Sequence, residues 1–302
     1  MSKTVAAPIG VLKTADRSLI SRRVWTFLRR WPVLPCLILA VLAVTGAVPD
    51  LIAPRDPYDA VLRQRLRPPA WMEGGSSENL LGIDHLGRDV LSRLIHGARV
   101  SLILAVVVVL ISAAVGTVLG MISGYYGGLV DDFVMRLVEI KQAVPLLLVA
   151  MIAAMVFGQS FTLLIVVLAF WSWTGFARQV RTEVLHLRTR EYVLNAKIMG
   201  ASTFRIFSRH LLPGVSNVVV VLSTLLVGSL ILTESVLSFL GAGIPPPRPA
   251  WGSMIAEGRE FLTNAWWIAT FPGVAIFLTV VAFNFLGDWL RDYWDPRLQQ
   301  TR

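Results

Sequence analysis

Long apolar runs alternate with polar segments along the chain, and the runs have the length of bilayer-crossing helices. A helix needs roughly 20 mostly apolar residues to cross the hydrocarbon core. The uncharged run 142–177 is long enough for two spans, with "FGQS" (157–160) as the turn. We therefore predict six transmembrane helices in an all-α fold, because nothing in the runs suggests strands. Their expected ranges are 33–52, 100–130, Met135 to the FGQS turn, 161–177, 211–239 and 268–287.

Composition agrees with this pattern. The 302-residue chain is 55% hydrophobic and 16% charged, with a mean hydropathy of +0.65, which favours an integral membrane protein over a soluble one. The single cysteine, Cys36, excludes an internal disulfide and offers no metal cluster, so we interpret it as a small core residue.

The net charge of +9 could indicate nucleic-acid binding, but its distribution favours membrane topology instead. Residues 1–31 hold seven basic residues against one acid (+6), and residues 178–209 hold seven against two (+5). Positive segments between spans lie on the cytoplasmic side. Four predicted spans separate the two blocks, an even number, so both can be cytoplasmic. We expect cytoplasmic termini (1–32 and 291–302), a first helix at 33–52 and an extracytoplasmic segment at 53–97.

The segment 53–97 is rich in proline and glycine at first and ends in an amphipathic stretch. Val90, Leu91 and Leu94 share one helical face, which predicts a helix lying on the membrane surface before the second span. His85 and His96 have no second ligand pattern nearby, so we assign them structural roles and no metal.

Two features inside the spans have open interpretations. Glu234 is the ionisable residue most clearly inside a span. It indicates either a translocation pathway, with Asn284 as a second candidate residue, or a hydrogen bond between helices, with Asn284 as the candidate partner. Gly116, Gly120 and Gly124 form a small-residue stripe that lets another helix approach, either within this chain or from another subunit. Lys141 is expected to snorkel to the interface.

The polar interval 178–214 contains the most informative stretch, "EYVLNAKIMGASTFRIFSRHLLPG". The helix predicted from Tyr192 to Met199 is apolar almost all round, so a second body must cover what its own bundle leaves exposed. Gly200 suits a left-handed helix stop and Ser202 a helix N-cap. A second short helix would place Phe204, Phe207 and Leu211 on one face. A helix presented in this way is a familiar recognition device.

This stretch resembles the cytoplasmic loop of ABC-importer permeases, a Glu-Ala-Ala, three residues, Gly, nine residues, Ile-x-Leu-Pro pattern. Ala196, Gly200, Leu212 and Pro213 match it, whereas Leu194, Asn195 and His210 depart from it. Five blocks, one of which overlaps this stretch, resemble the second permease of dipeptide, oligopeptide and nickel importers (DppC/OppC type). They are "LLGIDHLGRDVLSRLIHGARVSL", "GYYGGLVDDFVMRLVEI", "REYVLNAKIMGAS", "SFLGAGIPPPRPAWGSMIAEGR" and "FPGVAIFLTVVAFNFLGDWLRDYWDPRL".

The resemblance implies a type I ABC-importer permease fold, with a five-helix core at 98–290 and a coupling loop at 178–214. It also implies a bacterial inner-membrane location, a homologous second permease (DppB/OppB type), an extracytoplasmic binding protein and two ATPase subunits that hold ATP and Mg. The implied ATPase-coupling residues are Glu191, Tyr192, Leu194, Asn195, Ala196, Ile198, Met199, Gly200, Leu212 and Pro213.

The chain lacks a Gly-x-x-x-x-Gly-Lys-[Ser/Thr] phosphate loop, so energy is expected to come from partner chains, with no cofactor or catalytic residue here. Peptides are the expected cargo; nickel, glutathione or another small solute are the alternatives. An ion-coupled secondary transporter would rest on Glu234 alone and would leave the loop unexplained. A membrane enzyme would need clustered catalytic groups, which the four histidines do not supply.

Overall fold

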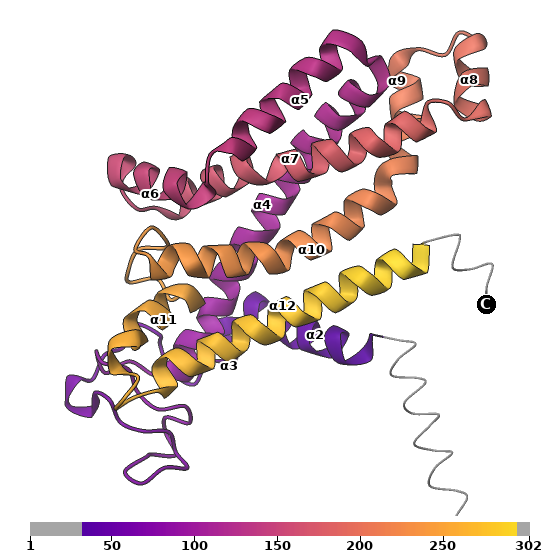
Figure 1. Cartoon of the computed structure of the whole chain (residues 1–302). Coiled ribbons are helices and arrows are strands. Elements are labelled where there is room, and N and C mark those ends of the chain that lie inside the picture. The colour runs from indigo at the N-terminus through magenta and orange to yellow at the C-terminus, as the bar shows by residue number, and fades with distance from the viewer. Residues whose placement is uncertain (1–31, 295–302) are drawn as a thin grey trace, which may run out of the picture.

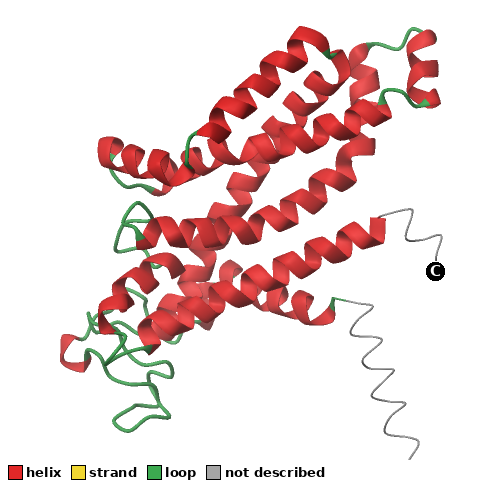
Figure 2. Cartoon of the chain, viewed as in Figure 1, coloured by secondary structure: helices red, strands yellow, loops and turns green. Residues whose placement is uncertain are grey.

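The computed structural model describes residues 32–294, and the regular structure in that range is helical (Figure 1, Figure 2). Within that range only two isolated β-bridges interrupt the helical pattern, Ala60 with Arg88 and Ile83 with Asp89. The expected cytoplasmic N-terminal segment and most of the C-terminal tail lie outside the described residues. The all-α prediction is confirmed for the part of the chain that the structure covers.

Four long helices form the frame: α4 (Val90–Tyr126), α7 (Phe161–Leu187), α10 (Leu212–Phe239) and α12 (Trp267–Trp294). The shorter helices are α2 (Val33–Ala47), α3 (Pro49–Ile52), α5 (Gly128–Ala143), α6 (Leu146–Phe157), α8 (Glu191–Ile198), α9 (Thr203–Ile206) and α11 (Trp251–Gly258). Single turns complete the chain at η1 (Leu62–Gln64), η2 (Phe207–Leu211) and η3 (Arg259–Phe261).

Four segments are long and apolar enough to cross a membrane, and the α5–α6 pair makes a fifth if it counts as one broken span. They are α4, α7, Thr203–Phe239 (which includes α10) and α12. The helix α2 has 15 residues and reaches only about 22 Å. The chain is therefore a multi-pass membrane protein, and the count of six spans stays a prediction.

The first predicted span, 33–52, is wrong as a single helix. It breaks at Val48 into α2 and α3, since Pro49 has no N–H and disfavours helical geometry at the residue before it. Cys36 was expected in the core, but its side chain is exposed on α2.

The predicted surface helix before the second span is also wrong. Residues 90–126 form one continuous helix of 37 residues, and the boundary expected at residue 98 falls inside it. Its first turn is capped by Asp89, whose carboxylate accepts a hydrogen bond from Ser92 N at 2.8 Å. No proline interrupts residues 90–126, and the helix ends only at Tyr126, where Gly127 takes φ +68°.

The third predicted span begins at Gly128 rather than near Met135, and it is bent by 77° between α5 and α6. The bend follows from Pro145, which cannot donate a backbone hydrogen bond and precedes α6. The FGQS turn is confirmed: α6 ends at Phe157, and Ser160 caps α7 by accepting from Leu163 N at 3.0 Å.

The glycine stripe of α4 packs against α7. A Cβ on Gly116 would lie 2.4 Å from the Trp173 carbonyl oxygen, and one on Gly120 would lie 2.6 Å from that of Ala177. Only glycine lets the two backbones come so close. The small residues therefore serve a contact within this chain, which was one of the two interpretations that the sequence left open.

The helices place the polar connections at two opposite ends of the bundle. Figure 1 shows α8 and α9 at one end, here called the loop end, and the segment 53–89 with α11 at the other, here called the far end. The helix α4 runs the whole distance between them, since it starts at the far end and finishes beside α9.

Candidate functional site: the loop between α7 and α10

The loop between α7 and α10 is held in shape by its own backbone. Gly200 has φ +77°, the left-handed conformation that the sequence predicts for a helix stop. The Ala201 N–H donates to the Ala196 carbonyl at 3.0 Å, and the Gly200 N–H donates to that of Lys197 at 3.1 Å. These two bonds form a Schellman motif. The Ser202 hydroxyl then caps α9 by accepting from Arg205 N at 3.4 Å, also as predicted.

One side of this loop is anchored in the bundle. Val193 is the buried residue of α8, and Ile206 and Leu211 are buried in the turns that follow. They join Val180 and Val184 of α7 in a small apolar core separate from the main one. The loop is therefore a folded element on a fixed base.

The other side of the loop is apolar and uncovered. Ile198 is 83% exposed, Met199 87% and Phe204 82%. Tyr192 and Leu194 extend this surface at 47% and 45% exposure. We call these five residues the loop patch. Large apolar side chains gathered at such exposure mark an interaction surface or an aggregation hazard, which agrees with the prediction that α8 needs a second body to cover it.

The predicted face of the second short helix is wrong in part. Phe204 and Leu211 were expected on one face, yet Phe204 is exposed and Leu211 is fully buried. Residues Phe207–Leu211 form a π-helical turn, and the wider turn brings Ile206 and Leu211, five residues apart, onto the buried side. The π turn thereby leaves Phe204 in the loop patch.

The remaining predicted coupling residues lie outside the loop patch and differ in exposure. Glu191, Asn195, Leu212 and Pro213 are exposed, whereas Ala196 is partly buried. The Tyr192 ring lies 6.0 Å from that of His210, which links α8 to the turn before α10. Leu194 stands where the related pattern has glutamate, and because it is 45% exposed it adds apolar surface at that position.

Ionic contacts brace the helix ends under the loop. Arg181 Nε and Ser123 Oγ both donate to Asp131 Oδ1 at 2.5 Å, which joins α7 and α4 to the start of α5. Arg188 Nη1 donates to the Gly124 carbonyl at 2.9 Å, at the end of α4. These contacts tie the ends of α4, α5 and α7 to one another beneath the loop.

The far end holds a second feature, an ion network that the sequence analysis missed. Arg93 Nη1 donates to Asp84 Oδ2 at 2.6 Å and to Glu257 Oε2 at 2.7 Å. Arg88 bonds the same two carboxylates, each at 2.7 Å. The network links α4 and the preceding segment to α11, across 164 positions of sequence. A pair so distant in sequence leaves no local pattern that could have indicated it.

The network has a clear electrostatic balance. Burial alone would raise the pKa of the Asp84 carboxyl, but Arg93 and Arg88 outweigh it and hold that pKa below its usual value. Burial would likewise raise the pKa of the Glu257 carboxyl, but Arg93 and Arg88 outweigh it and hold that pKa below its usual value. His85 lies beside both carboxylates, and the three could in principle hold a metal ion. Since two guanidinium groups already occupy the carboxylates and the His85 ring stacks on Phe261, we interpret the group as an ion network.

The two predicted pathway residues do not meet. Glu234 is fully buried, and its Oε1 accepts from Ser238 Oγ at 2.7 Å on the same helix. Asn284, its expected partner, is exposed on α12 and makes no hydrogen bond with it. The bond between helices that the sequence suggested is therefore wrong.

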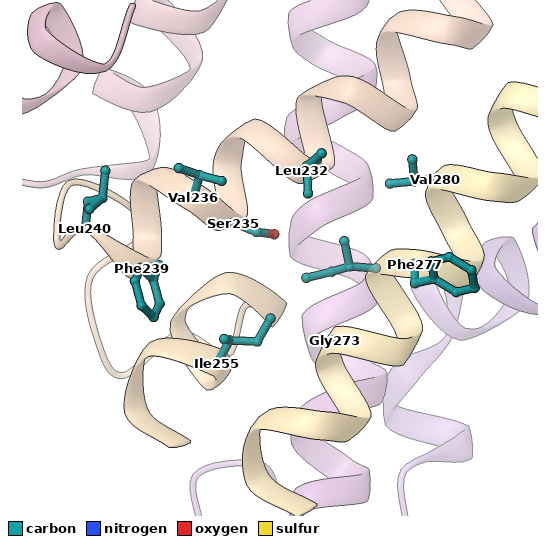
Figure 3. Close-up of a pocket in the computed structure, with 10 residues that line it drawn as sticks. Leu232, Ser235, Val236, Phe239, Leu240, Ile255, Gly273, Phe277 and Val280 are labelled. Atoms are coloured by element: carbon teal, nitrogen blue, oxygen red, sulfur yellow. The ribbon is translucent and has the colours of Figure 1, made fainter. Parts of the chain in front are cut away.

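A large apolar cavity of about 650 Å³ lies among α10, α11 and α12 (Figure 3). Glu234 does not line it, and the hydroxyl of Ser235, its polar member, donates to the Ile231 carbonyl at 2.7 Å. A surface of this kind suits apolar groups and offers a polar solute little.

A smaller cavity of about 280 Å³ lies where α5 and α6 meet, facing α7 and α10, and polar and apolar residues share its lining. Lys141 projects into it: its Nζ donates to Thr174 Oγ1 at 3.0 Å and lies 4.1 Å from the centroid of the Trp171 ring. The sequence placed this lysine at the interface, and the structure instead folds its ammonium group against α7.

Comparison with known proteins gives a consistent result. The sequence profile described as "Binding-protein-dependent transport system inner membrane component" matches residues 116–300. A dipeptide transport system permease protein of Haemophilus influenzae is 38% identical over 90% of this chain and 92% of its own length. A di/tripeptide permease of Pseudomonas aeruginosa is 40% identical over 88% of each chain. A glutathione permease of Pectobacterium atrosepticum is 43% identical over 75% of each.

Proposed function

Because the chain belongs to the family of binding-protein-dependent transport system inner membrane components, we propose that it is the permease subunit of an ABC importer for short peptides, driven by ATPase subunits that dock on the loop patch. The related permeases carry names for dipeptide, di- or tripeptide and glutathione transport. Each of those solutes is a short peptide with free carboxylates. We assign this chain the same class of cargo.

The observation that supports docking is the contrast between the two sides of α8. Val193 is buried against α7 while Ile198 and Met199, at the end of the same helix, are almost wholly exposed. Leaving such an apolar surface exposed on an eight-residue helix carries a risk of aggregation unless a partner covers it. It fits the mode in which an amphipathic helix inserts its apolar side chains into a groove of a partner.

The topology follows from the same proposal. The loop end faces the cytoplasm of a bacterium and the far end faces outward from the inner membrane, with six spans if α2–α3 and α5–α6 each count as one. A second permease completes the pathway, and a binding protein delivers the solute to the far end. Two ATPase subunits hold ATP and Mg. Their closure moves the loop, and the braced ends of α4, α5 and α7 transmit that movement to the spans.

The direct test changes one residue of the patch without touching the fold. Met199→Glu places a charge at an 87% exposed position, and Leu62→Glu on η1 places the same charge at a 66% exposed position at the far end. We expect Met199→Glu to abolish co-purification of the ATPase subunits and ATP-driven peptide uptake, because a carboxylate would be buried in an apolar groove. Leu62→Glu should leave co-purification intact. Normal ATPase recovery with Met199→Glu would refute docking at this patch.

A further inference from the structure

The cavity beside Lys141 has a chemistry that the docking loop does not explain. The Lys141 ammonium group has three N–H donors. One donates to Thr174 Oγ1, and the positive charge of the group lies over the face of the Trp171 ring. Among residues 32–294, no carboxylate lies within 4 Å of this ammonium group. The cation is thus held in place without a counter-ion.

The direction of the side chain is informative. The apolar part of α7 runs from Phe161 to Ala177, where Arg178 begins the charged end. A snorkelling lysine would turn its ammonium toward that charged end. Lys141 instead bonds Thr174 and lies over Trp171, which is almost one turn deeper in the apolar part. A charged side chain inside a membrane span is costly, and the usual reason for keeping one is a route for ions or solutes.

The cavity divides into a donor side and an acceptor side. On the donor side, Lys141 is joined by Gln142, whose Oε1 accepts from Arg178 Nη2 at 2.8 Å and whose amide N–H groups are therefore the part left to donate. On the acceptor side, the Ser229 and Thr233 hydroxyls of α10 donate to their own helix, at 2.9 and 2.7 Å. Their oxygen lone pairs remain available to a ligand that donates.

From this arrangement we propose that the cavity between α5, α7 and α10 is a transient binding site for one end of the transported solute, with Lys141 receiving its carboxylate. The hydroxyls of α10 receive N–H groups of the same solute. The inference rests on the proposed function, because it needs a solute that bears a carboxylate close to N–H groups, as short peptides do. The cavity of about 280 Å³ has the volume of on the order of nine waters, enough for the end of a small peptide.

The site would act at a defined stage of transport. Lys141 lies on α5, the helix whose start is tied to α7 by Asp131 and Arg181 beneath the loop. A movement of the loop therefore shifts the lysine relative to α10, and with it the two halves of the cavity. Lys141 would hold the solute in one state and release it in the other.

The test uses the complete transporter, with both permeases, the ATPases and the binding protein, in proteoliposomes. Uptake of Ala-Ala by the wild type tests the proposed function first; its absence would reject that function before any variant is made. The variants are Lys141→Gln, Lys141→Arg and, as control, Arg136→Gln, which removes a 75% exposed cation from the same helix. Co-purification of all subunits is the check on assembly.

We expect Lys141→Gln to lower Ala-Ala uptake about tenfold, because one charge-assisted hydrogen bond is lost. Lys141→Arg should retain most of the uptake and Arg136→Gln all of it. A second readout replaces Leu226, which also lines the cavity, with p-benzoylphenylalanine and measures cross-linking to radiolabelled Ala-Ala. Lys141→Gln should lower that signal by the same factor, and Ala-Ala-amide should compete far less well than Ala-Ala.

Several results would overturn the site while leaving the proposed function intact. Wild-type uptake and cross-linking with Lys141→Gln would do so, as would equal competition by the amide. Loss of the second permease from the purified complex would show that Lys141 pairs with a subunit carboxylate. Loss of bound anionic lipid with unchanged uptake would assign the lysine to a headgroup.

Discussion

The far-end ion network gives the sharpest energetic prediction. Arg93 is 1% exposed, and Arg93→Met removes its bonds to Asp84 and Glu257 while filling much of the same volume. Removing one member of a buried ion pair costs about 3–5 kcal/mol, because its partner stays buried without compensation. Arg88 still contacts both carboxylates at 2.7 Å, so we expect the lower end of that range, about 3 kcal/mol.

A matched control separates this effect from the loss of any arginine. Arg55 pairs with Glu78 at the same 2.7 Å, but the two side chains are 32% and 67% exposed. Arg55→Met should therefore cost about 1 kcal/mol or less, as exposed pairs do. The two variants remove the same charge from the same end of the molecule and differ in burial.

Hydrogen exchange is the suitable assay, because it reports the free energy of local opening at individual backbone amides. About 3 kcal/mol corresponds to exchange faster by on the order of 100-fold, measured on the backbone amides of residues 82–90 and 251–258. Arg55→Met should change the same amides by less than about tenfold. Equal effects from the two variants would refute the argument that burial gives the network its strength.

Three further predictions follow from particular residues. The pKa values of Asp84 and Glu257 are lowered in the folded protein, so the stability that these carboxylates contribute is present above the ordinary carboxyl pKa and is lost as pH falls through the folded values. Hydrogen-exchange protection at the far end, corrected for intrinsic exchange, should therefore hold from pH 7 to 5 and fall below about pH 4. Loss between pH 7 and 5 would contradict the direction of both shifts. Gly120→Ala should destabilise the detergent-solubilised protein by about 1–3 kcal/mol, because the added Cβ would lie 2.6 Å from a backbone carbonyl oxygen. The control Gly273→Ala, whose Cβ would have nothing within 4 Å, should be neutral or slightly stabilising. Equal melting temperatures for the two variants would refute the α4–α7 contact. Gly200→Val should uncouple ATP hydrolysis from uptake because a β-branched residue is strained at φ +77°, while Gly200→Asn should retain coupling; full uptake with Val would count against a fixed loop.

Much of the helical framework was predictable because long apolar runs allow little else in a bilayer. The turn at 157–160 and the starts of α7, α10 and α12 fall within a few residues of the expected positions. The predictions failed where one residue changes the backbone direction. Pro49 breaks the first helix and Pro145 bends the third, and each effect depends on a single missing donor rather than on periodicity.

The candidate site divides in the same way. Gly200, Ser202 and the apolar excess of α8 carry local signals, so the loop could be recognised and its stop and cap predicted. The exposure of Phe204 could not, because it depends on a π turn that the α-helical period does not describe. The ion network and the Lys141 cavity join residues far apart in sequence, and only the packing of the helices brings them together.

The most direct test of the central claim is the accessibility of Met199. In a Cys36→Ser background, which removes the single native cysteine, Met199→Cys should react with a membrane-impermeant maleimide in inverted inner-membrane vesicles and not in intact cells. Adding the ATPase subunits to stripped vesicles should then block the reaction. Labelling from outside intact cells, or unchanged labelling when the ATPases are bound, would contradict the claim that they grip this permease at the loop patch.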